Sequence, residues 1–303
     1  MSAQSTRKTG LPIASRPSQL DRASHLRTDK QALDSLFAQS LTFEVSGGKV
    51  AVTPTGLELL SSKDIDLGSS EKFFLGISNE DERPYFAIHR EEPGENFQSL
   101  REVAHHFAPL DLELAMHAIA LSNWHHAHPR CSRCGASTRV DLGGAVRVCD
   151  VDQMQHHPRT DSAVIVLVRD RSDRILLGHQ PVWPEGRYST FAGFLEPGET
   201  FEQCVIREVR EESGVEVSEM EYLGSQPWPF PASIMIAFAA ITDNPTQAKA
   251  DGEEIADVKW FTRDQLKSEA AAGTLLLPPT VSVARQMIEM WLGEAATGGE
   301  TWR

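Results

Sequence analysis

Residues 193–215 read GFLEPGETFEQCVIREVREESGV, a segment in which glutamates and arginines recur at short spacing. Residues 200–213 are predicted to form a helix. Thr200 is a good residue for the N-terminal cap of a helix, and Gly214 is typical of the position just after a helix ends. The segment therefore predicts a single helix that is preceded by a glycine-containing loop.

Three glutamates of this helix, Glu208, Glu211 and Glu212, stand at positions i, i+3 and i+4 and share one helical face. Like charges at this spacing repel each other and weaken a helix, so the pattern favours a bound cation. Clustered carboxylate oxygens suit Mg²⁺ or Mn²⁺. For the three glutamates alone, the alternative is a solvated acidic helix.

The complete pattern is Gly-x5-Glu-x7-Arg-Glu-Val-x-Glu-Glu-x-Gly-Val, and it resembles the Nudix box at every defining position. The resemblance implies metal-dependent hydrolysis of a diphosphate linked to a nucleoside or a similar group. It also implies an α/β/α sandwich with a mixed sheet. The box alone does not identify the substrate.

Composition narrows the class of protein. The 303 residues are enough for two domains, and 40% hydrophobic with 24% charged residues is typical of a globular protein. A net charge of -14 argues against a non-specific grip on nucleic acid. We expect a mobile tail over 1–30, which lacks a secretory signal, and a second tail over 294–303. Four cysteines, three of them clustered, favour a reducing cytoplasm and a metal site over disulfides.

A small α+β domain is predicted over 31–127. Apolar runs at 49–53, 72–78 and 84–90 are typical of strands, and 110–128 has helical periodicity. The domain contains no catalytic motif, and structural or solvated roles are expected for its scattered histidines, His105, His106, His117, His125 and His126.

A zinc-ribbon-like segment is predicted over 128–157. Cys131 and Cys134 form a Cys-x2-Cys-Gly knuckle, and Cys149 with Asp152 repeats the spacing. Asp152 stands where a fourth cysteine is expected, so it is one candidate for the fourth ligand. The other candidates are His126, His128 and His156. The alternative is a ribbon that no longer holds metal. Cys204, inside the predicted helix, is expected to be a buried small residue.

The domain over 158–293 begins after His157-Pro158-Arg159. Strands are predicted at 163–170 and 174–180, joined as a hairpin, and again at 233–241. Residues 252–266 predict a loop, a strand and the start of a helix, and 281–292 predict an amphipathic helix.

Three alternate prolines restrict the backbone of residues 225–233, which read SQPWPFPAS. The restricted backbone is expected to present Trp228 and Phe230 rigidly. A bend that packs both aromatic rings into the core is the alternative. Following a Nudix box, this run resembles the signature of the NADH pyrophosphatase family, and the likeness extends over roughly 125–292. That family cleaves NAD(H) to nicotinamide mononucleotide and AMP. Its bacterial members also remove NAD caps from RNA 5′ ends, and it forms homodimers.

The resemblance implies a role for particular residues. Glu208, Glu211 and Glu212 would be catalytic metal ligands, joined by Glu254 and by the carbonyl oxygen of Ala192. The implied substrate-binding residues are Arg101, His157, Phe194, Gln226, Pro227, Trp228, Pro229, Phe230, Pro231, Ala232, Ser233 and Ala284.

The chain departs from the family at two positions. His157 replaces a tyrosine that packs on the ligand, which predicts weaker and pH-dependent stacking. Gly144 stands where a substrate-contacting glutamate is expected, so that contact should be absent. Arg207 is predicted to pair with Glu199 or Glu211 and to orient the loop.

Two functional alternatives to an NAD(H) diphosphatase stay open. One is a Nudix hydrolase that prefers ADP-ribose or another nucleoside diphosphate derivative. The other is a non-catalytic ligand sensor on the same fold. Mutually repelling glutamates disfavour the sensor, and the proline-aromatic run favours NAD(H) over ADP-ribose.

Overall fold

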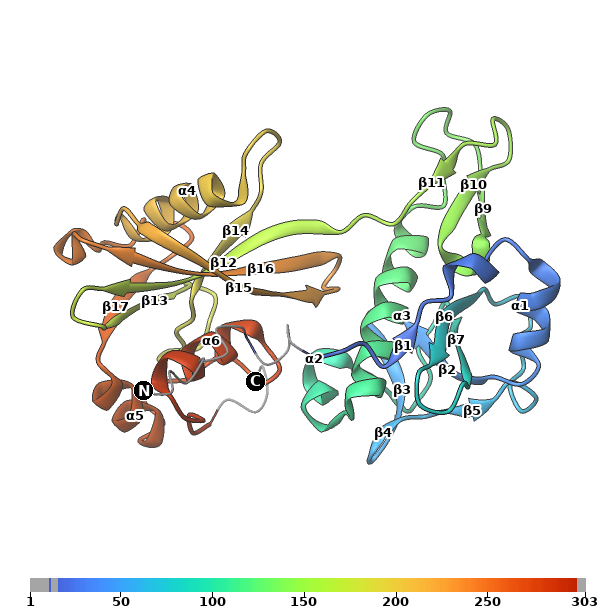
Figure 1. Ribbon diagram of the computed structural model, residues 1–303, viewed down its shortest axis with the longest axis horizontal. Helices are drawn as coiled ribbons and strands as arrows, with labels where there is room; N and C mark the ends of the chain where they lie inside the picture. The colour runs from blue at the N-terminus through green and yellow to red at the C-terminus, as the bar shows by residue number, and fades with distance from the viewer. Residues whose placement is uncertain (1–10, 12–15, 299–303) are drawn as a thin grey trace, which may run out of the picture. The chain divides into compact units, whose positions relative to one another are not determined.

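The computed structural model describes Leu11 and residues 16–298, shown in Figure 1. These residues divide into two compact units. The N-terminal unit contains residues 17–160 and 228–233. The other unit, called the Nudix unit because it contains the box-like segment 193–215, comprises Leu11, Arg16 and residues 161–227 and 234–298.

In the described part of the chain, the strands are β1 (Leu20–Asp21), β2 (Leu41–Ser46), β3 (Lys49–Thr53), β4 (Gly56–Leu57), β5 (Leu60–Ser61), β6 (Lys72–Ser78), β7 (Pro84–His89), β8 (Phe97–Ser99), β9 (Thr138–Asp141), β10 (Val146–Cys149), β11 (Gln155–His156), β12 (Asp161–Asp170), β13 (Ile175–His179), β14 (Phe191–Phe194), β15 (Ser218–Trp228), β16 (Ser233–Thr242) and β17 (Asp257–Phe261). The α-helices are α1 (Lys30–Phe37), α2 (Leu100–Val103), α3 (Pro109–Ala127), α4 (Phe201–Ser213), α5 (Arg263–Ala271) and α6 (Val283–Leu292). Short 3-10 turns are η1 (Ser24–Leu26), η2 (Ala104–His106), η3 (Leu142–Gly144) and η4 (Pro245–Gln247).

The Nudix unit is built on a sheet with strand order β15-β16-β12-β13-β17, and β14 pairs with β12. Side chains alternate between the faces of β12. Val164, Val166 and Val168 pack in one core with residues of α4. Ile165 and Leu167 pack in the other core with residues of α5 and α6. Helices therefore cover both faces, as Figure 1 shows, and the predicted α/β/α sandwich is confirmed.

The N-terminal unit has its own sheet, ordered β1-β6-β7-β2-β3-β4, with β5 on β2 and β8 on β3. Strands β2 and β7 are parallel, whereas β6 and β7 are antiparallel, so this sheet is mixed. Helix α3 packs against β2 and β6. A separate three-stranded sheet, β11-β10-β9, carries the cysteine segment.

The predicted strands at 49–53, 72–78 and 84–90 are confirmed as β3, β6 and β7, and the helix at 110–128 as α3. The hairpin of β12 and β13, strand β16, the β17–α5 segment and the helix near 281–292 are confirmed as well. Among the described residues, no helix combines the length and apolar character that crossing a membrane requires.

The predicted N-terminal tail is too long. Residues 1–10 and 12–15 of that tail, and residues 299–303 of the C-terminal one, lie outside the described residues. Within 16–29, however, β1 pairs with β6, and Leu20 and Ala23 are buried. Two buried residues and a two-residue strand are too short to produce a sequence periodicity, so the pattern did not predict them.

Candidate metal-dependent active site

Helix α4 begins and ends as the sequence predicts. The Thr200 hydroxyl accepts a hydrogen bond from the Gln203 backbone N–H, and the Gln203 side chain accepts one from the Thr200 N–H. This capping box pairs two N–H groups that would lack partners within the helix. Gly214 closes the helix at φ 71, a left-handed conformation that favours glycine. Cys204 is fully buried, as expected.

Strand β14 brings its backbone against the carboxylate side of α4. A Cβ added to Gly193 would lie 1.9 Å from Cδ of Glu208, which is far inside van der Waals contact. Glycine is therefore required at 193 for Glu208 to take its observed position. The first glycine of the box acts by leaving space for a carboxylate.

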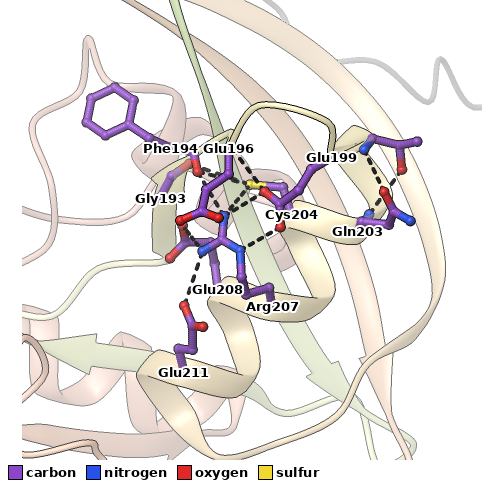
Figure 2. A network of polar contacts seen from close by, with 10 residues as sticks. Gly193, Phe194, Glu196, Glu199, Gln203, Cys204, Arg207, Glu208 and Glu211 are labelled. Carbon is purple, nitrogen blue, oxygen red and sulfur yellow. Dashed lines mark hydrogen bonds and ion pairs between the residues drawn. The ribbon is translucent and has the colours of Figure 1, made fainter.

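Arg207 is the centre of a polar network, shown in Figure 2. Its Nε and Nη2 donate to the two carboxylate oxygens of Glu199 at 2.6 and 2.8 Å. Its Nη1 donates to Glu208 at 2.7 Å and to Glu211 at 3.1 Å. Nη2 also donates to the carbonyl oxygen of Phe194 at 2.9 Å. The pairing of Arg207 with Glu199 and Glu211 agrees with the sequence prediction, and Glu208 is an additional partner.

Two carboxyl groups bonded to Arg207 have pKa values shifted in opposite directions. Hydrogen bonding to Arg207 lowers the pKa of Glu199 to about 2. Burial raises the pKa of Glu208 even though Arg207 opposes the shift. Arg207 therefore holds Glu199 ionised and connects the loop before α4 to the helix.

Glu212 is the most enclosed carboxylate of the predicted metal cluster, with 3% of its surface exposed. Burial raises its pKa to about 8, and the negative charge of Glu254 adds to the rise. The Ala192 N–H donates to its Oε2 at 3.1 Å. Glu212 is thus a buried carboxylate beside the charges of Glu254 and Glu208, which a divalent cation would stabilise, and carboxylate oxygens suit Mg²⁺ or Mn²⁺.

The other predicted site residues of the Nudix unit differ in how far their side chains are exposed to solvent. The Phe194 ring is 58% exposed and points away from the Arg207 network in Figure 2. Ala284 is buried in α6. Gln226 is buried, and its amide donates to the Val281 carbonyl at 2.8 Å and accepts from the Val283 N–H at 2.7 Å. The Gln226 side chain therefore fixes the start of α6.

Residues 228–233 belong to the N-terminal unit. Trp228 and Phe230 meet edge to face at 5.0 Å, and the Arg101 guanidinium lies 4.6 Å from the centre of the Phe230 ring. Asn123, on α3, donates to the carbonyl oxygens of Pro229 and Pro231 at 3.0 and 3.3 Å. Because each proline lacks an N–H, this run has few backbone donors of its own, and Asn123 supplies one to its carbonyl oxygens from α3. Sequence reasoning missed Asn123, because a lone asparagine in a helix gives no signal of such a contact.

The two departures from the family have different structural settings. At Gly144, φ is 96 and an added Cβ would lie 2.8 Å from the Phe73 ring. The His125 ring also bonds to the Gly144 carbonyl oxygen at 2.8 Å. A glutamate side chain cannot be accommodated at 144 without repacking Phe73. His157 is exposed.

The predicted cysteine cluster assembles in the N-terminal unit. One ligand atom from each of Cys131, Cys134, Cys149 and Asp152 lies within 4.8 Å of the others. The Sγ atoms of Cys134 and Cys149 are 3.5 Å apart, close to the ~3.8 Å expected for two thiolates on one tetrahedral zinc. His156 Nε2 lies 3.3 Å from Cys131 Sγ and so competes with Asp152 as the fourth ligand.

Comparison with known proteins agrees with this geometry. The NUDIX domain family matches residues 158–278. A Mycobacterium bovis protein named NAD-capped RNA hydrolase NudC is 37% identical over 300 residues, covering 93% of this chain and 95% of that protein. A Stutzerimonas stutzeri protein of the same name is 37% identical over 221 residues, covering 72% and 76%. The Macaca fascicularis NAD-capped RNA hydrolase NUDT12 is 39% identical over 181 residues, covering 56% and 39%. The chain is therefore a Nudix hydrolase and belongs to the family of the NAD-capped RNA hydrolases NudC.

Proposed function

We propose that this protein hydrolyses the diphosphate of NAD(H) to nicotinamide mononucleotide and AMP, and that it removes NAD caps from RNA 5′ ends. The observation that carries the proposal is the buried carboxylate of Glu212 on the box helix, whose pKa is raised first by burial and then by the charges of Glu254 and Glu208. Similarity to NudC proteins over nearly the whole chain supports NAD(H) as the substrate. The 225–233 run supports it further.

Metal binding is assigned to the carboxylate face of α4. Glu208, Glu211 and Glu212 would hold Mg²⁺ or Mn²⁺ together with Glu254 and the Ala192 carbonyl. When bound there, such ions would supply positive charge to neutralise the diphosphate and would lower the pKa of a water molecule for attack at phosphorus. Arg207 keeps Glu208 and Glu211 in place, since its guanidinium bonds to both.

Substrate contacts are proposed in each unit separately. In the Nudix unit, the exposed Phe194 ring offers a face on which a base can stack. In the N-terminal unit, the Arg101 guanidinium lies over the rings of Trp228 and Phe230, and we propose that this group also contacts the substrate. The other residues proposed for substrate contact are His157, Pro229, Pro231, Ala232 and Ser233 in the N-terminal unit, and Gln226, Pro227 and Ala284 in the Nudix unit.

Three further assignments are part of the proposal. A zinc ion held by Cys131, Cys134, Cys149 and either Asp152 or His156 would stabilise the ribbon, in a structural role. The protein would act as a homodimer. Its free cysteines are consistent with a cytoplasmic location.

One set of incubations tests the activity. The full-length protein is mixed separately with NADH, ADP-ribose and an NAD-capped RNA, each with Mg²⁺ or Mn²⁺, and the products are identified by mass spectrometry. Release of AMP and reduced nicotinamide mononucleotide from NADH is the expected result. Faster turnover of ADP-ribose would favour the other Nudix chemistry, and no turnover of any substrate would favour the ligand sensor.

A further inference from the structure

A second group of metal-ligand side chains lies in the N-terminal unit. It consists of His89 at the end of β7, Glu91 two residues later, and His126 near the end of α3. One ligand atom from each of the three residues lies within 4.8 Å of the other two. None of these residues belongs to the cysteine cluster or to the Nudix box.

The three side chains line a cavity of about 640 Å³, which lies wholly within the N-terminal unit. Ser122 also lines it, and it stands one helical turn before His126 on the same face of α3. The cavity therefore joins the end of β7 to α3, and His89 and His126 reach it from two different elements.

His89 is held in an orientation that suits a metal ligand. The residue is buried, and its Nδ1 lies 2.9 Å from Oγ of Ser122. When Nδ1 donates this bond, the lone pair of Nε2 faces the Glu91 carboxylate, whose Oε1 is 4.0 Å away. A metal-ligating histidine usually donates its other ring N–H to an oxygen acceptor, and the Ser122 hydroxyl oxygen supplies such an acceptor here.

Charge explains why this arrangement calls for a cation. In the tautomer whose Nδ1 donates to Ser122, Nε2 of His89 carries a lone pair that faces Oε1 of Glu91 at 4.0 Å. The lone pair and the carboxylate oxygen repel each other when no cation lies between them. A metal ion between Nε2 and Oε1 would remove that repulsion.

The spacing needs only a small adjustment. Ligands ~2.1 Å from a tetrahedral ion are ~3.4 Å from each other. The Glu91 side chain is 83% exposed and is free to close the gap from 4.0 Å. His126 is exposed as well.

We propose that His89, Glu91 and His126 bind a divalent transition-metal ion of the Zn²⁺ or Ni²⁺ class in this cavity. Two imidazoles and one carboxylate favour these ions over Mg²⁺, which prefers oxygen ligands. Three protein ligands leave at least one coordination position for water or for a ligand oxygen. The donor set differs from the thiolates of the ribbon and from the all-oxygen Nudix cluster, so the three sites can be separated experimentally.

The test is an isothermal titration of the full-length protein, without a polyhistidine tag, with Ni²⁺ in excess Mg²⁺. Mg²⁺ occupies the carboxylate cluster, and Cys134→Ser removes the ribbon as a competing site. We expect Ni²⁺ binding that His126→Gln and Glu91→Gln each weaken by ~10-fold or more. Both residues are exposed, so these variants should fold.

His106→Gln, which changes an exposed histidine outside the cluster, and Cys134→Ser should leave the Ni²⁺ affinity unchanged. Ni²⁺ should also raise the melting temperature of the wild type but not that of His126→Gln. Equal affinity of the wild type and His126→Gln would overturn the proposal, as would loss of all Ni²⁺ binding in Cys134→Ser. No substrate is present, so the result is independent of the diphosphatase activity.

Discussion

The carboxylate of Glu208 occupies the space into which a side chain at Gly193 would project. A Cβ added to Gly193 would lie 1.9 Å from Cδ of Glu208. Residues 193 and 208 are on different elements, β14 and α4, so this close approach links the strand to the proposed metal-binding helix. Substitution of Gly193 should therefore affect the position of a carboxylate.

We expect Gly193→Ala to lower kcat/KM for NADH by ~10²-fold, because a displacement of about 1 Å at a metal ligand has effects of that size. Circular dichroism should show that the variant is folded. Gly94→Ala is the control, since the nearest atoms to its Cβ belong to the side chains of Phe97, at 3.1 Å, and Asn96, neither of which is a proposed metal ligand. Wild-type kinetics of Gly193→Ala would contradict the role assigned to this glycine.

Replacement of Glu212 by Gln should reduce turnover by at least ~10²-fold with the fold retained, because the amide keeps the shape but cannot supply a negative metal ligand. Steady-state kinetics with Mg²⁺ and with Mn²⁺ measure the loss. Glu202→Gln, in the first turn of the same helix and exposed, is the matched control. Unchanged turnover of Glu212→Gln would exclude this residue as a ligand.

Substitution of Arg207 by Lys should lower both stability and activity. An ammonium group cannot replace a planar guanidinium that bonds to three carboxylates and a carbonyl at once. Since the side chain is 20% exposed, a loss of about 1–3 kcal/mol in unfolding free energy is expected. Urea unfolding measures it, with Arg210→Lys, exposed on the same helix, as the control. Equal stability of the two variants would argue against the network.

Asn123→Asp removes the donor that binds the Pro229 and Pro231 carbonyl oxygens and keeps the side-chain shape. If residues 228–231 contact the substrate as proposed, KM for NADH should rise by ~10-fold with a smaller effect on kcat. Asn79→Asp is the matched control, because Asn79 donates a similar bond to the Ser18 carbonyl oxygen. A wild-type KM for Asn123→Asp would show that this anchoring does not matter for binding.

His117 should contribute to acid sensitivity. Burial lowers its pKa to about 3, and its Nδ1 is buried without a hydrogen-bond partner in the part of the chain that the structure describes. Its pKa in the unfolded chain is ~6.5, so the unfolded state binds more protons between pH 6.5 and 3. This contribution to stability is complete above pH 6.5 and falls by roughly 4–5 kcal/mol as the pH approaches 3.

Thermal unfolding from pH 7 to pH 4 would measure that effect. Between pH 7 and pH 4, the melting temperature of His117→Leu should fall less than that of the wild type. The melting temperature of His106→Gln, which changes an exposed residue, should fall as much as that of the wild type. Parallel curves for His117→Leu and the wild type would show that His117 does not titrate as proposed.

Local sequence was enough to predict where helix α4 begins and ends and which face carries its carboxylates. The cap at Thr200, the stop at Gly214 and the i, i+3, i+4 spacing of the glutamates depend only on neighbours within a few residues. The strands β3, β6 and β7 were predictable for the same reason, because their apolar runs are bounded by turn residues.

The tertiary structure decided which distant residues meet. Residues 228–233 follow a strand of the Nudix unit, yet they belong to the N-terminal unit, where Asn123 binds them from more than a hundred positions away. His89 and His126 lie far apart in the sequence, and β7 and α3 place them at one cavity. Such contacts depend on strand pairing and helix packing between separate segments, so short-range patterns in the sequence do not predict them. The sequence alone determined the reaction chemistry of α4, and only the fold determined what surrounds it.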